Sequence, residues 1–321
     1  MENLSTIKQT PLVSKIKSRI ILGSIYLGLA VFCWSGGNII YKFWSESLPP
    51  YLILFFRYVL ASLFLGIIWI QGKGYKEPLD RKTVLTLVVL GLVGIAFHNL
   101  SLFLGVKYTS ATMGAIILAT APIIAQFLAV PALKHRISTE VIGWSIVSLI
   151  GVVIVVGVGW ETPNWEGLLW LFGSTLTLAF FNVYAVKLMQ ESSITPKTLT
   201  FVTISVAMIP FFPLIFLDPW DITVLNTVPI LASFWFSILY LVVVGNVIGR
   251  SLYNIGVQKA GSSIATVFIN FGPIFTGILA FIFLNEIPTI GMLIGSVFVI
   301  VGVMGIVKAE NREHKKQQDN Q

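Results

Sequence analysis

Thr109-Ser110-Ala111-Thr112-Met113-Gly114 begins the stretch of sequence that decides the fold. An apolar run follows it as far as Pro131 and is interrupted by Pro122. We interpret the stretch as a membrane-spanning helix with a proline inside it. A second run of this kind follows Ala260-Gly261-Ser262-Ser263 and is interrupted by Pro273. Interrupted spans at corresponding places in two halves are typical of transporter binding sites. The alternative is that each proline only kinks a packed helix, which membrane spans tolerate.

The two stretches belong to a longer internal repeat. Aligned without gaps at a shift of 151 positions, residues 105–152 match residues 256–303 with ten identities in 48 positions. The identical pairs are Gly105 and Gly256, Val106 and Val257, Pro122 and Pro273, Ile123 and Ile274, Leu128 and Leu279, Ala129 and Ala280, Leu133 and Leu284, Ser145 and Ser296, Gly151 and Gly302, and Val152 and Val303. Apolar composition alone does not explain this agreement, so the chain consists of two copies of one unit.

Composition places the chain in a bilayer. Its 321 residues are 56% hydrophobic and 11% charged, with a mean hydropathy of +0.88. A helix needs about 20 apolar residues to cross ~30 Å of hydrocarbon. We predict ten such spans: Ile20–Tyr41, Tyr51–Ile70, Val84–Leu104, Ala111–Val130, Val141–Val158, Leu168–Val186, Leu199–Leu217, Trp235–Ile255, Ile264–Leu284 and Ile290–Val307. The predicted fold is an all-α integral membrane protein without a separate soluble domain.

The spans divide the chain into two halves of five. We predict a cytoplasmic N-terminal tail over 1–19, a first repeat over 20–158, an external linker over 159–167, a second repeat over 168–307 and a cytoplasmic C-terminal tail over 308–321. Because five is odd, the second copy enters the membrane from the opposite side. The ten helices therefore form a 5+5 inverted repeat.

The net charge of +7 reflects membrane topology and does not indicate a nucleic-acid partner. Of the 21 Lys and Arg residues, seventeen fall in the tails and in alternate loops on one side. Only Lys42 and Lys107 fall on the other side, and Arg57 and Arg250 lie within spans. By the positive-inside rule, both termini of this multi-pass protein lie on the cytoplasmic side of the cell membrane. The single cysteine, Cys33, excludes an intramolecular disulfide.

Four motifs make the chain similar to a known family. They resemble the EamA-type transporters of the drug/metabolite transporter superfamily, and the resemblance covers essentially all of the chain except the tails. The matching residues are Cys33-Trp34-Ser35-Gly36-Gly37-Asn38, Arg57-Tyr58-Val59-Leu60-Ala61, Gly105-Val106-Lys107-Tyr108-Thr109-Ser110-Ala111 with Pro122, and Gly272-Pro273 with Phe283-Leu284-Asn285-Glu286. The resemblance implies ten spans in an inverted repeat, a central cavity facing alternate sides, and export of amino acids, their analogues or other small metabolites.

Two departures from the family pattern concern specific residues. The usual Trp-Gly pair is Trp34-Ser35 here. The Leu-Gly-Glu ending expected after both prolines is Leu284-Asn285-Glu286 in the second half but Leu133-Lys134-His135 in the first. The second departure questions any symmetric role for that glutamate.

Titratable groups inside spans are few. All fourteen Asp and Glu residues fall in tails, loops or span ends, so the usual proton site of a proton-coupled carrier is missing. His98 is the one mid-span group that titrates near neutrality when unperturbed. It either forms a hydrogen bond between helices or carries a proton. For Arg57 we expect a structural or gating contact, with snorkelling to the interface as the alternative.

Arg250 replaces Asn99 at the equivalent position of the second half. It either binds a substrate carboxylate or snorkels. Asn246, Arg250 and Asn254 recur every four residues, which predicts one helix face lining the cavity. The candidate substrate-binding residues are Trp34, Asn38, His98, Asn99, Asn182, Asn246, Arg250, Asn254 and Asn270. The candidate helix-break or gating residues are Pro122, Pro273 and Arg57.

These features predict a carrier that exports a small metabolite, first of all an amino acid, by alternating access. Its partners are the substrate and the lipid bilayer; coupling to a proton or another ion is left open. The rival class is a membrane-embedded enzyme or lipid-modifying protein with an interfacial site. Lys134-His135-Arg136 or the Asp218–Asp221 loop could begin such a site, but neither contains an acid/base set. We predict no catalytic residue, no metal site and no cofactor.

Overall fold

The computed structural model describes residues 11–72, 77, 79–133, 138–157, 164–217, 228–260 and 268–319. All regular elements in these ranges are helices. Nine stretches of the described residues are long and apolar enough to cross a membrane: Ile20–Trp44, Pro50–Gln71, Arg81–Tyr108, Ala111–Ala132, Thr139–Gly157, Trp165–Glu191, Pro196–Phe216, Leu231–Ala260 and Ile290–Ala309. The prediction of an all-α membrane protein is confirmed.

The ninth predicted span, Ile264–Leu284, is described only from Phe268 onward. There it contains a shorter apolar helix, α14 (Gly272–Leu284). The count of ten spans therefore stays a prediction. The same holds for the bounds of the tails and the linker, since residues 1–10 and 158–163 lie outside the described ranges, as do Lys134-His135-Arg136 and the Asp218–Asp221 loop.

Several helices make up each half of the chain. The first half contains α1 (Pro11–Trp44), α2 (Pro50–Gln71), α3 (Arg81–Val89), the π-helix η2 (Leu90–Phe97), α4 (His98–Tyr108), α5 (Ala111–Leu118), α6 (Ala121–Leu133) and α7 (Thr139–Gly157). The second half contains α8 (Trp165–Glu191), α9 (Pro196–Ala207), α10 (Phe211–Leu217), α11 (Val228–Leu239), the π-helix η4 (Tyr240–Ile248), α12 (Gly249–Ala260), α14 and α15 (Ile290–Asp319). Polar side chains cap the starts of α3, α5, α8 and α9, where they accept backbone N–H bonds: Asp80, Ser110, Asn164 and Thr195.

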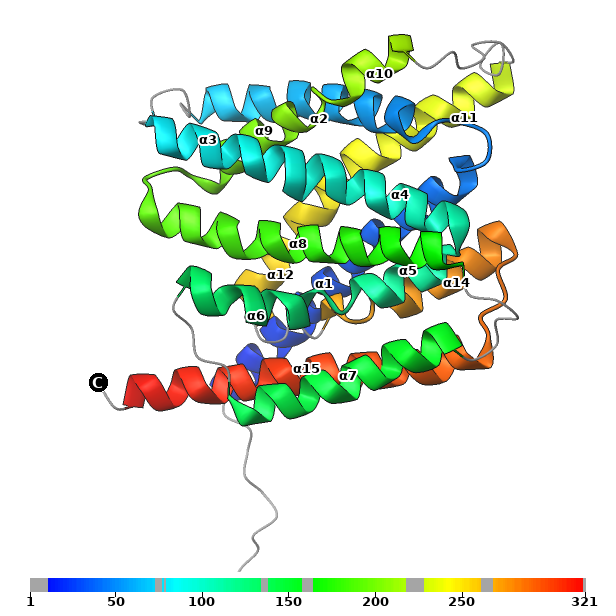
Figure 1. Cartoon of the computed structure of the whole chain (residues 1–321). Coiled ribbons are helices and arrows are strands. Elements are labelled where there is room, and N and C mark those ends of the chain that lie inside the picture. Colours follow the sequence, from blue (N-terminus) through cyan, green and yellow to red (C-terminus); the bar gives the residue numbers. More distant parts are fainter. Residues whose placement is uncertain are drawn as a thin grey trace, which may run out of the picture.

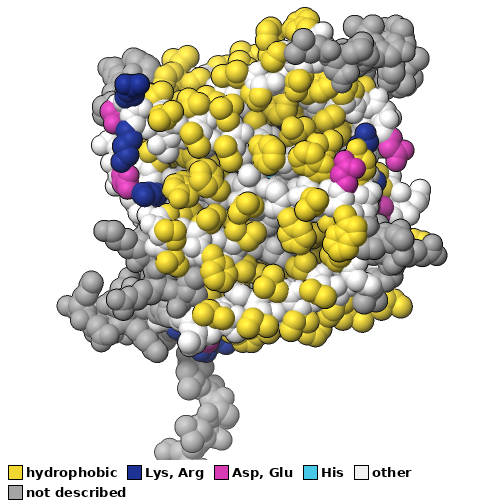
Figure 2. Space-filling model, viewed as in Figure 1, with side chains coloured by type: hydrophobic (Ala, Val, Ile, Leu, Met, Phe, Trp, Pro, Cys, Tyr) yellow, Lys and Arg dark blue, Asp and Glu magenta, His cyan; other side chains and the backbone are white. Residues whose placement is uncertain are grey.

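The long helices lie roughly side by side (Figure 1), and side-chain chemistry changes along their length. Figure 2 shows a face that is apolar across its middle, with charged side chains at the two ends of the helices. Large apolar residues stand exposed on the bundle surface, such as Leu169 at 72% and Val153 at 70%. An exposed apolar band between two charged edges is the surface that a bilayer covers.

Helix packing pairs elements of one half with elements of the other. α7 packs along α15, and α2 packs on α9. The first helix of each half also packs on a helix of the other half, α1 on α12 and α8 on α4. Glycines let α7 and α15 approach closely: a Cβ on Gly151 would lie 2.6 Å from the Gly295 carbonyl oxygen, and one on Gly302 would lie 2.6 Å from the Ser148 nitrogen. The shift of 151 that relates Gly151 to Gly302 also relates Ser148 to Val299, another contact of Gly151.

The two π-helices also occupy equivalent positions, because a shift of 151 places residues 90–97 on 241–248. Each contains a glycine at the same place, Gly94 and Gly245, and each glycine meets an aromatic residue of the other half's first helix. A Cβ on Gly94 would lie 2.7 Å from the Phe181 Cβ. The Gly245 carbonyl accepts a hydrogen bond from Trp34. Wide π-helical turns inside α-helices are often found at functional sites.

Candidate functional site

Both proline-containing spans are interrupted just before their prolines. A turn at Ala119-Thr120 separates α5 from α6, which carries Pro122 as its second residue. A turn at Asn270-Phe271 precedes α14, which carries Pro273 as its second residue. The two turns are equivalent in the repeat, because a shift of 151 positions relates Ala119-Thr120 to Asn270-Phe271. Each break exposes helix-end backbone groups inside the bundle, the arrangement that many carriers use around their substrates.

The second break holds polar groups without partners. Asn270 is only 1% exposed, and its Nδ2 has no hydrogen-bond partner among the described residues. The Oγ1 of Thr276, which lies in α14, is equally buried and likewise lacks a partner among the described residues. An unmet buried donor costs about 1–3 kcal/mol. The break therefore has hydrogen-bonding capacity that a bound molecule or water could use.

Trp34 and Ser35 join this break to the eighth span. The Trp34 Nε1 donates to the Gly245 carbonyl oxygen at 2.8 Å, and its ring lies 5.3 Å from that of Tyr253. The Ser35 Oγ lies 3.0 Å from the Val31 carbonyl oxygen and 3.3 Å from that of Gly272. Two adjacent residues of α1 thus contact η4, α12 and the start of α14.

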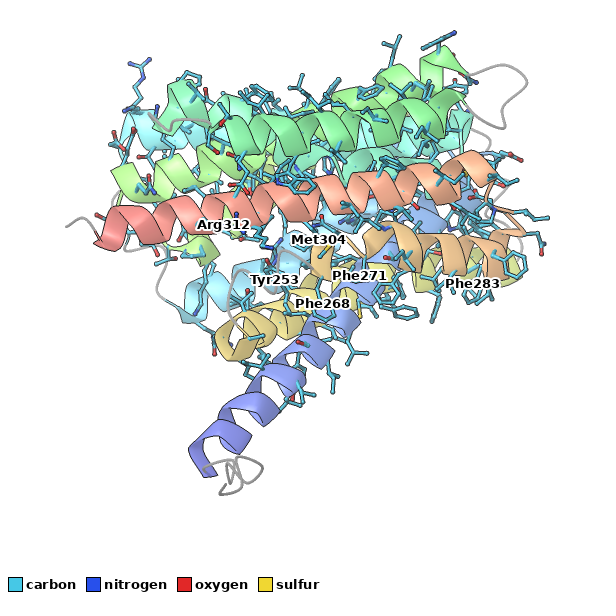
Figure 3. The ribbon with its side chains drawn as sticks, turned by 90° about the horizontal axis from the view of Figure 1, so that it is seen from below. Tyr253, Phe268, Phe271, Phe283, Met304 and Arg312 are labelled. Carbon is cyan, nitrogen blue, oxygen red and sulfur yellow. The ribbon has the colours of Figure 1, made fainter. Side chains whose placement is uncertain are left out.

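Tyr253 stands on α12, Phe271 opens α14 and Phe283 lies near the far end of α14 (Figure 3). Tyr253 lies towards the same end of the molecule as Phe271 in this view, and away from Phe283. The Phe268 and Phe271 rings are tilted by 41° with their centroids 5.9 Å apart, and Phe268 also approaches Gly28 of α1. Aromatic side chains therefore form two contacts in this region, Trp34 with Tyr253 and Phe268 with Phe271.

Arg250 and Asn254 lie one turn apart on α12 with exposed side chains. Neither makes a hydrogen bond or ion pair with a described residue. Arg250 is three positions from Tyr253, so both lie on one side of α12, the side that meets Trp34. Asn246 lies in η4, where i→i+5 bonds widen each turn. The four-residue spacing therefore places Arg250 and Asn254 on one face of α12, and Asn246 lies half-buried in the preceding η4.

Arg57 points into the bundle and links three helices. Its Nη1 donates to the Tyr41 hydroxyl and, at 3.0 Å, to the Asn99 Oδ1. The Tyr41 hydroxyl also donates to the same Oδ1 at 2.9 Å, and the Asn99 Nδ2 donates to the Ile95 carbonyl oxygen. The guanidinium lies 5.7 Å from the centre of the Tyr58 ring, and its Nε has no partner among the described residues. Asn99 is thus bonded within α1, α2 and α4, whereas Arg250 at the equivalent position is not.

The remaining candidates differ in their surroundings. His98 is buried, and its Nδ1 lies 2.9 Å from both the carbonyl oxygen and the Oγ of Ser174 on α8. This is a hydrogen bond between helices. Asn38 is half-buried and Asn182 is exposed. Neither Asn38 nor Asn182 makes a side-chain hydrogen bond within the part of the chain that the structure describes.

Sequence reasoning did not single out several groups that the structure brings into play. Tyr41 forms hydrogen bonds with Arg57 and Asn99, and the Tyr253 ring contacts Trp34. A tyrosine in an apolar run gives no sequence signal of such a role. Glu286 was noticed only as a motif residue, yet its carboxylate contacts the start of α5, 175 positions away. A groove of about 740 Å³ also opens between α1, η4 with α11, and α14, and it contains none of the predicted residues. Its lining includes Phe32, Gly36, Ser237, Tyr240 and Phe283.

Within the described ranges, no three His, Cys, Asp or Glu residues are placed to hold a metal ion together. Among the described residues, the site offers the guanidinium of Arg250 without an anionic partner, the buried amide of Asn270 and the aromatic rings of Trp34 and Tyr253. Such groups can bind a small molecule that combines a carboxylate with an apolar part.

Comparison with known proteins gives matches over nearly the whole chain. The EamA-like transporter family matches it twice, over residues 21–157 and 165–308. An uncharacterized transporter, YyaM, from Bacillus subtilis is 27% identical over 299 residues, covering 91% of this chain and 96% of its own. An uncharacterized transporter from Archaeoglobus fulgidus is 28% identical over 285 residues, covering 87% and 95%.

More distant similarity reaches a plant protein and a solved structure. A WAT1-related protein from Arabidopsis thaliana is 23% identical and covers 85% of each chain. One crystal structure superposes with a TM-score of 0.60 at 14% identity, covering 92% of this chain and 98% of the other. The second likeness concerns the fold alone.

Proposed function

Because this chain belongs to the EamA-like transporter family, within the drug/metabolite transporter superfamily, we propose that it exports amino acids or related compounds by alternating access. The family and the transporter relatives make it a multi-pass membrane transporter of small molecules. The proposal adds the substrate class, the direction and the mechanism. It places both termini in the cytoplasm and the protein in the cell membrane.

The observation that carries the substrate class is Arg250. Its guanidinium lies in a span and has no carboxylate partner among the described residues. A charged guanidinium within a membrane span is costly unless it pairs with an anion, and a substrate carboxylate supplies one. A guanidinium can bind both oxygens of that carboxylate at once. Asn254 lies on the same face for a further polar contact, and Trp34 offers an apolar ring.

The two equivalent breaks support the mechanism. The first break divides its span into α5 and α6, and the second lies at the equivalent place directly before α14. Each half therefore has a joint at which the helix after the break can tilt. A carrier built from inverted repeats alternates by exchanging the conformations of its two halves around one site. Asn270, in the second break with an unmet Nδ2, would contact the substrate during this exchange.

Ion coupling is tested by the same transport measurement. The spans carry no interior carboxylate in sequence, and His98 is bonded to Ser174. A proton carrier would therefore need a group other than the usual buried acid.

The test uses the purified full-length protein in liposomes loaded with labelled amino acids. We expect efflux above that of protein-free liposomes, measured with and without a pH gradient. Compounds recovered outside should be chemically unchanged by mass spectrometry, which separates transport from an interfacial enzyme. No efflux of any amino acid, with efflux of another metabolite class, would overturn the substrate assignment and leave the family intact.

The orientation is tested with single cysteines in a Cys33→Ala background. A cysteine in place of Trp165 should react with impermeant maleimide added outside intact cells, and one in place of Lys197 should not. The reverse pattern would invert the proposed topology.

A further inference from the structure

Glu286 connects the end of one proline-containing span to the start of the other. Its Oε1 accepts the Ala111 N–H at 3.0 Å. Its Oε2 lies 3.4 Å from the Thr112 nitrogen and 3.3 Å from the Thr112 Oγ1. Asn285, in the left-handed conformation with φ 54°, ends α14 and turns the chain so that this contact is reached. The carboxylate therefore bridges α14 and α5.

This contact completes the start of α5. A helix leaves its first four N–H groups without partners inside the helix. Here Glu286 takes those of Ala111 and Thr112, while Ser110 takes that of Met113 with its Oγ and that of Gly114 with its carbonyl oxygen. A negative carboxylate also complements the positive end of the helix dipole. Charge and hydrogen-bond count both favour the bridged arrangement.

A second contact ties α1 to the same place. The Lys42 Nζ donates to the carbonyl oxygens of Lys107 and Thr109 at 3.1 and 3.0 Å. These carbonyls belong to the last turn of α4 and the residue after it. Behind both contacts lies a small buried cluster from α1, α5 and α14: Ile39, Ala111, Leu279 and Ala280. The ends of α1, α4, α5 and α14 are thus closed over an apolar layer, on the outer side of the proposed topology.

The arrangement has no counterpart of the same chemistry in the other half. A shift of 151 places Glu286 on His135, within the basic triplet Lys134-His135-Arg136, and places Ala111-Thr112 on Ser262-Ser263. Those residues lie outside the described ranges. A neutral imidazole accepts one hydrogen bond and an imidazolium accepts none, so neither can replace a carboxylate with two acceptor oxygens at a helix start.

We infer that the contact of Glu286 with Ala111 and Thr112, here named the outer latch, holds the outer side closed, and that His135 at the position equivalent to Glu286 cannot form the same contact. The conformation closed to the outside is then the resting state of the free protein. In this state a site for a cytoplasmic substrate faces the side from which an exporter loads. The inference rests on the proposed alternating access, but its test needs no substrate.

The test uses the full-length protein with Cys33→Ala and a reporter, Ala280→Cys, because Ala280 is 0% exposed behind the latch. Impermeant maleimide is added outside intact cells. Adding Glu286→Gln should raise the labelling rate about tenfold or more, the shift that losing one charge-assisted hydrogen bond produces. Glu46→Gln is the matched control, since Glu46 is an exposed outer-side glutamate whose side chain makes no hydrogen bond with a described residue. It should leave the rate unchanged.

A second reporter distinguishes gate opening from general loosening. Asn254→Cys on α12, labelled in inside-out vesicles, should react more slowly when Glu286→Gln is present. Thr112→Val keeps the side-chain shape, removes one donor and should raise labelling at Ala280→Cys to a smaller extent. An unchanged rate at Ala280→Cys in both variants would overturn the latch. So would a rise at both reporters together. Failure of amino-acid efflux alone would leave the latch standing and reject only the proposed substrate.

Discussion

Trp34 and Gly245 are joined by a 2.8 Å hydrogen bond from indole to carbonyl, although 211 positions separate them in the chain. The bond connects the first helix of one half to the π-helical turn of the other. Gly94 is the position of the first half that is equivalent to Gly245. There the first helix of the second half makes a packing contact, in which Phe181 fills the space above Gly94. The two glycines are equivalent, but only the contact at Gly245 contains a hydrogen bond that a substitution can remove.

Replacing Trp34 with Phe tests that bond. The ring contact with Tyr253 can persist, while the Gly245 carbonyl loses the indole donor. We expect a loss of unfolding free energy of about 0.5–1.5 kcal/mol, the net worth of one such bond. Thermal unfolding in detergent measures it, with Trp165→Phe as the control because Trp165 is 66% exposed. Equal effects of the two substitutions would mean that the bond contributes nothing.

Substituting Gly151 with Ala should separate α7 from α15. A Cβ there would lie 2.6 Å from the Gly295 carbonyl oxygen and 2.7 Å from the Val299 nitrogen, both of which are backbone atoms. Overpacking of this kind costs about 1–3 kcal/mol. Gly143→Ala on the same helix is the control, since a Cβ at Gly143 meets nothing within 4 Å. A melting temperature lowered in Gly151→Ala and not in Gly143→Ala is the expected result.

The Arg57 contacts with Tyr41 and Asn99 should behave as one unit. Arg57→Met removes the donor from the half-buried Asn99 Oδ1, and Asn99→Ala removes that acceptor. Each is expected to destabilise the protein, but the double variant should lose less than the sum of the two. Coupling between bonded neighbours is about 0.5–3 kcal/mol in such cycles. Additive losses of unfolding free energy would show that the two side chains act independently.

Arg250 should distinguish substrates by charge. If it binds a carboxylate, Arg250→Gln raises the apparent Km for zwitterionic and anionic substrates by roughly tenfold to a hundredfold. Arg250→Lys recovers only part of the affinity, because an ammonium cannot bind both oxygens in a fork. Cationic compounds without a carboxylate should change little. The control is Arg81→Gln at the exposed start of α3, and an unchanged Km for amino acids in Arg250→Gln would place the carboxylate site elsewhere.

We expect the stability of the fold to depend on pH through Glu77, which lies outside the membrane-spanning segments. Partial desolvation acts to raise its pKa, but hydrogen bonds from Thr195 and Thr198 outweigh this and hold the pKa below its usual range. Its carboxylate accepts from the Thr195 nitrogen at 2.9 Å and the Thr195 Oγ1 at 2.8 Å, at the start of α9. A carboxyl whose folded pKa is lowered stabilises the fold fully above its unfolded pKa of about 4.3. That contribution is lost as the pH falls through the folded value.

Melting temperatures of the wild type and Glu77→Gln should therefore differ most near neutral pH and converge below about pH 4. Glu46→Gln, which lacks such contacts, should track the wild type at every pH. A gap between wild type and Glu77→Gln that is constant with pH would show that titration of Glu77 does not contribute.

Hydropathy was enough to locate most of the fold. The second span was predicted over Tyr51–Ile70, and the structure has it over Pro50–Gln71. The π-helices were not foreseen, because one extra residue per turn leaves the hydrophobic run unchanged. Asn246 falls in η4, so its four-residue spacing from Arg250 crosses from the π-helix into α12, and a face shared by the two residues stays a prediction.

The site was less accessible to sequence reasoning than the spans. The charge of Arg57 inside a span marked it for attention, but its bonds with Tyr41 and Asn99 depend on how three helices cross. Glu286 sits at a span end, where a carboxylate ordinarily meets water. Its role at the start of α5 follows only from the packing of α14 on α5.

The matched π-helices bear on how the chain originated. Their alignment under the same ungapped shift that relates the rest of the repeat means that the extra residue was present in the ancestral unit before the gene duplicated. That unit, five helices long, would have paired with a copy of itself inserted in the opposite orientation. Fusion then allowed the two copies to diverge. Asn99 is replaced by Arg250 at the equivalent position, and His135 by Glu286; two identical subunits could not have differed in this way.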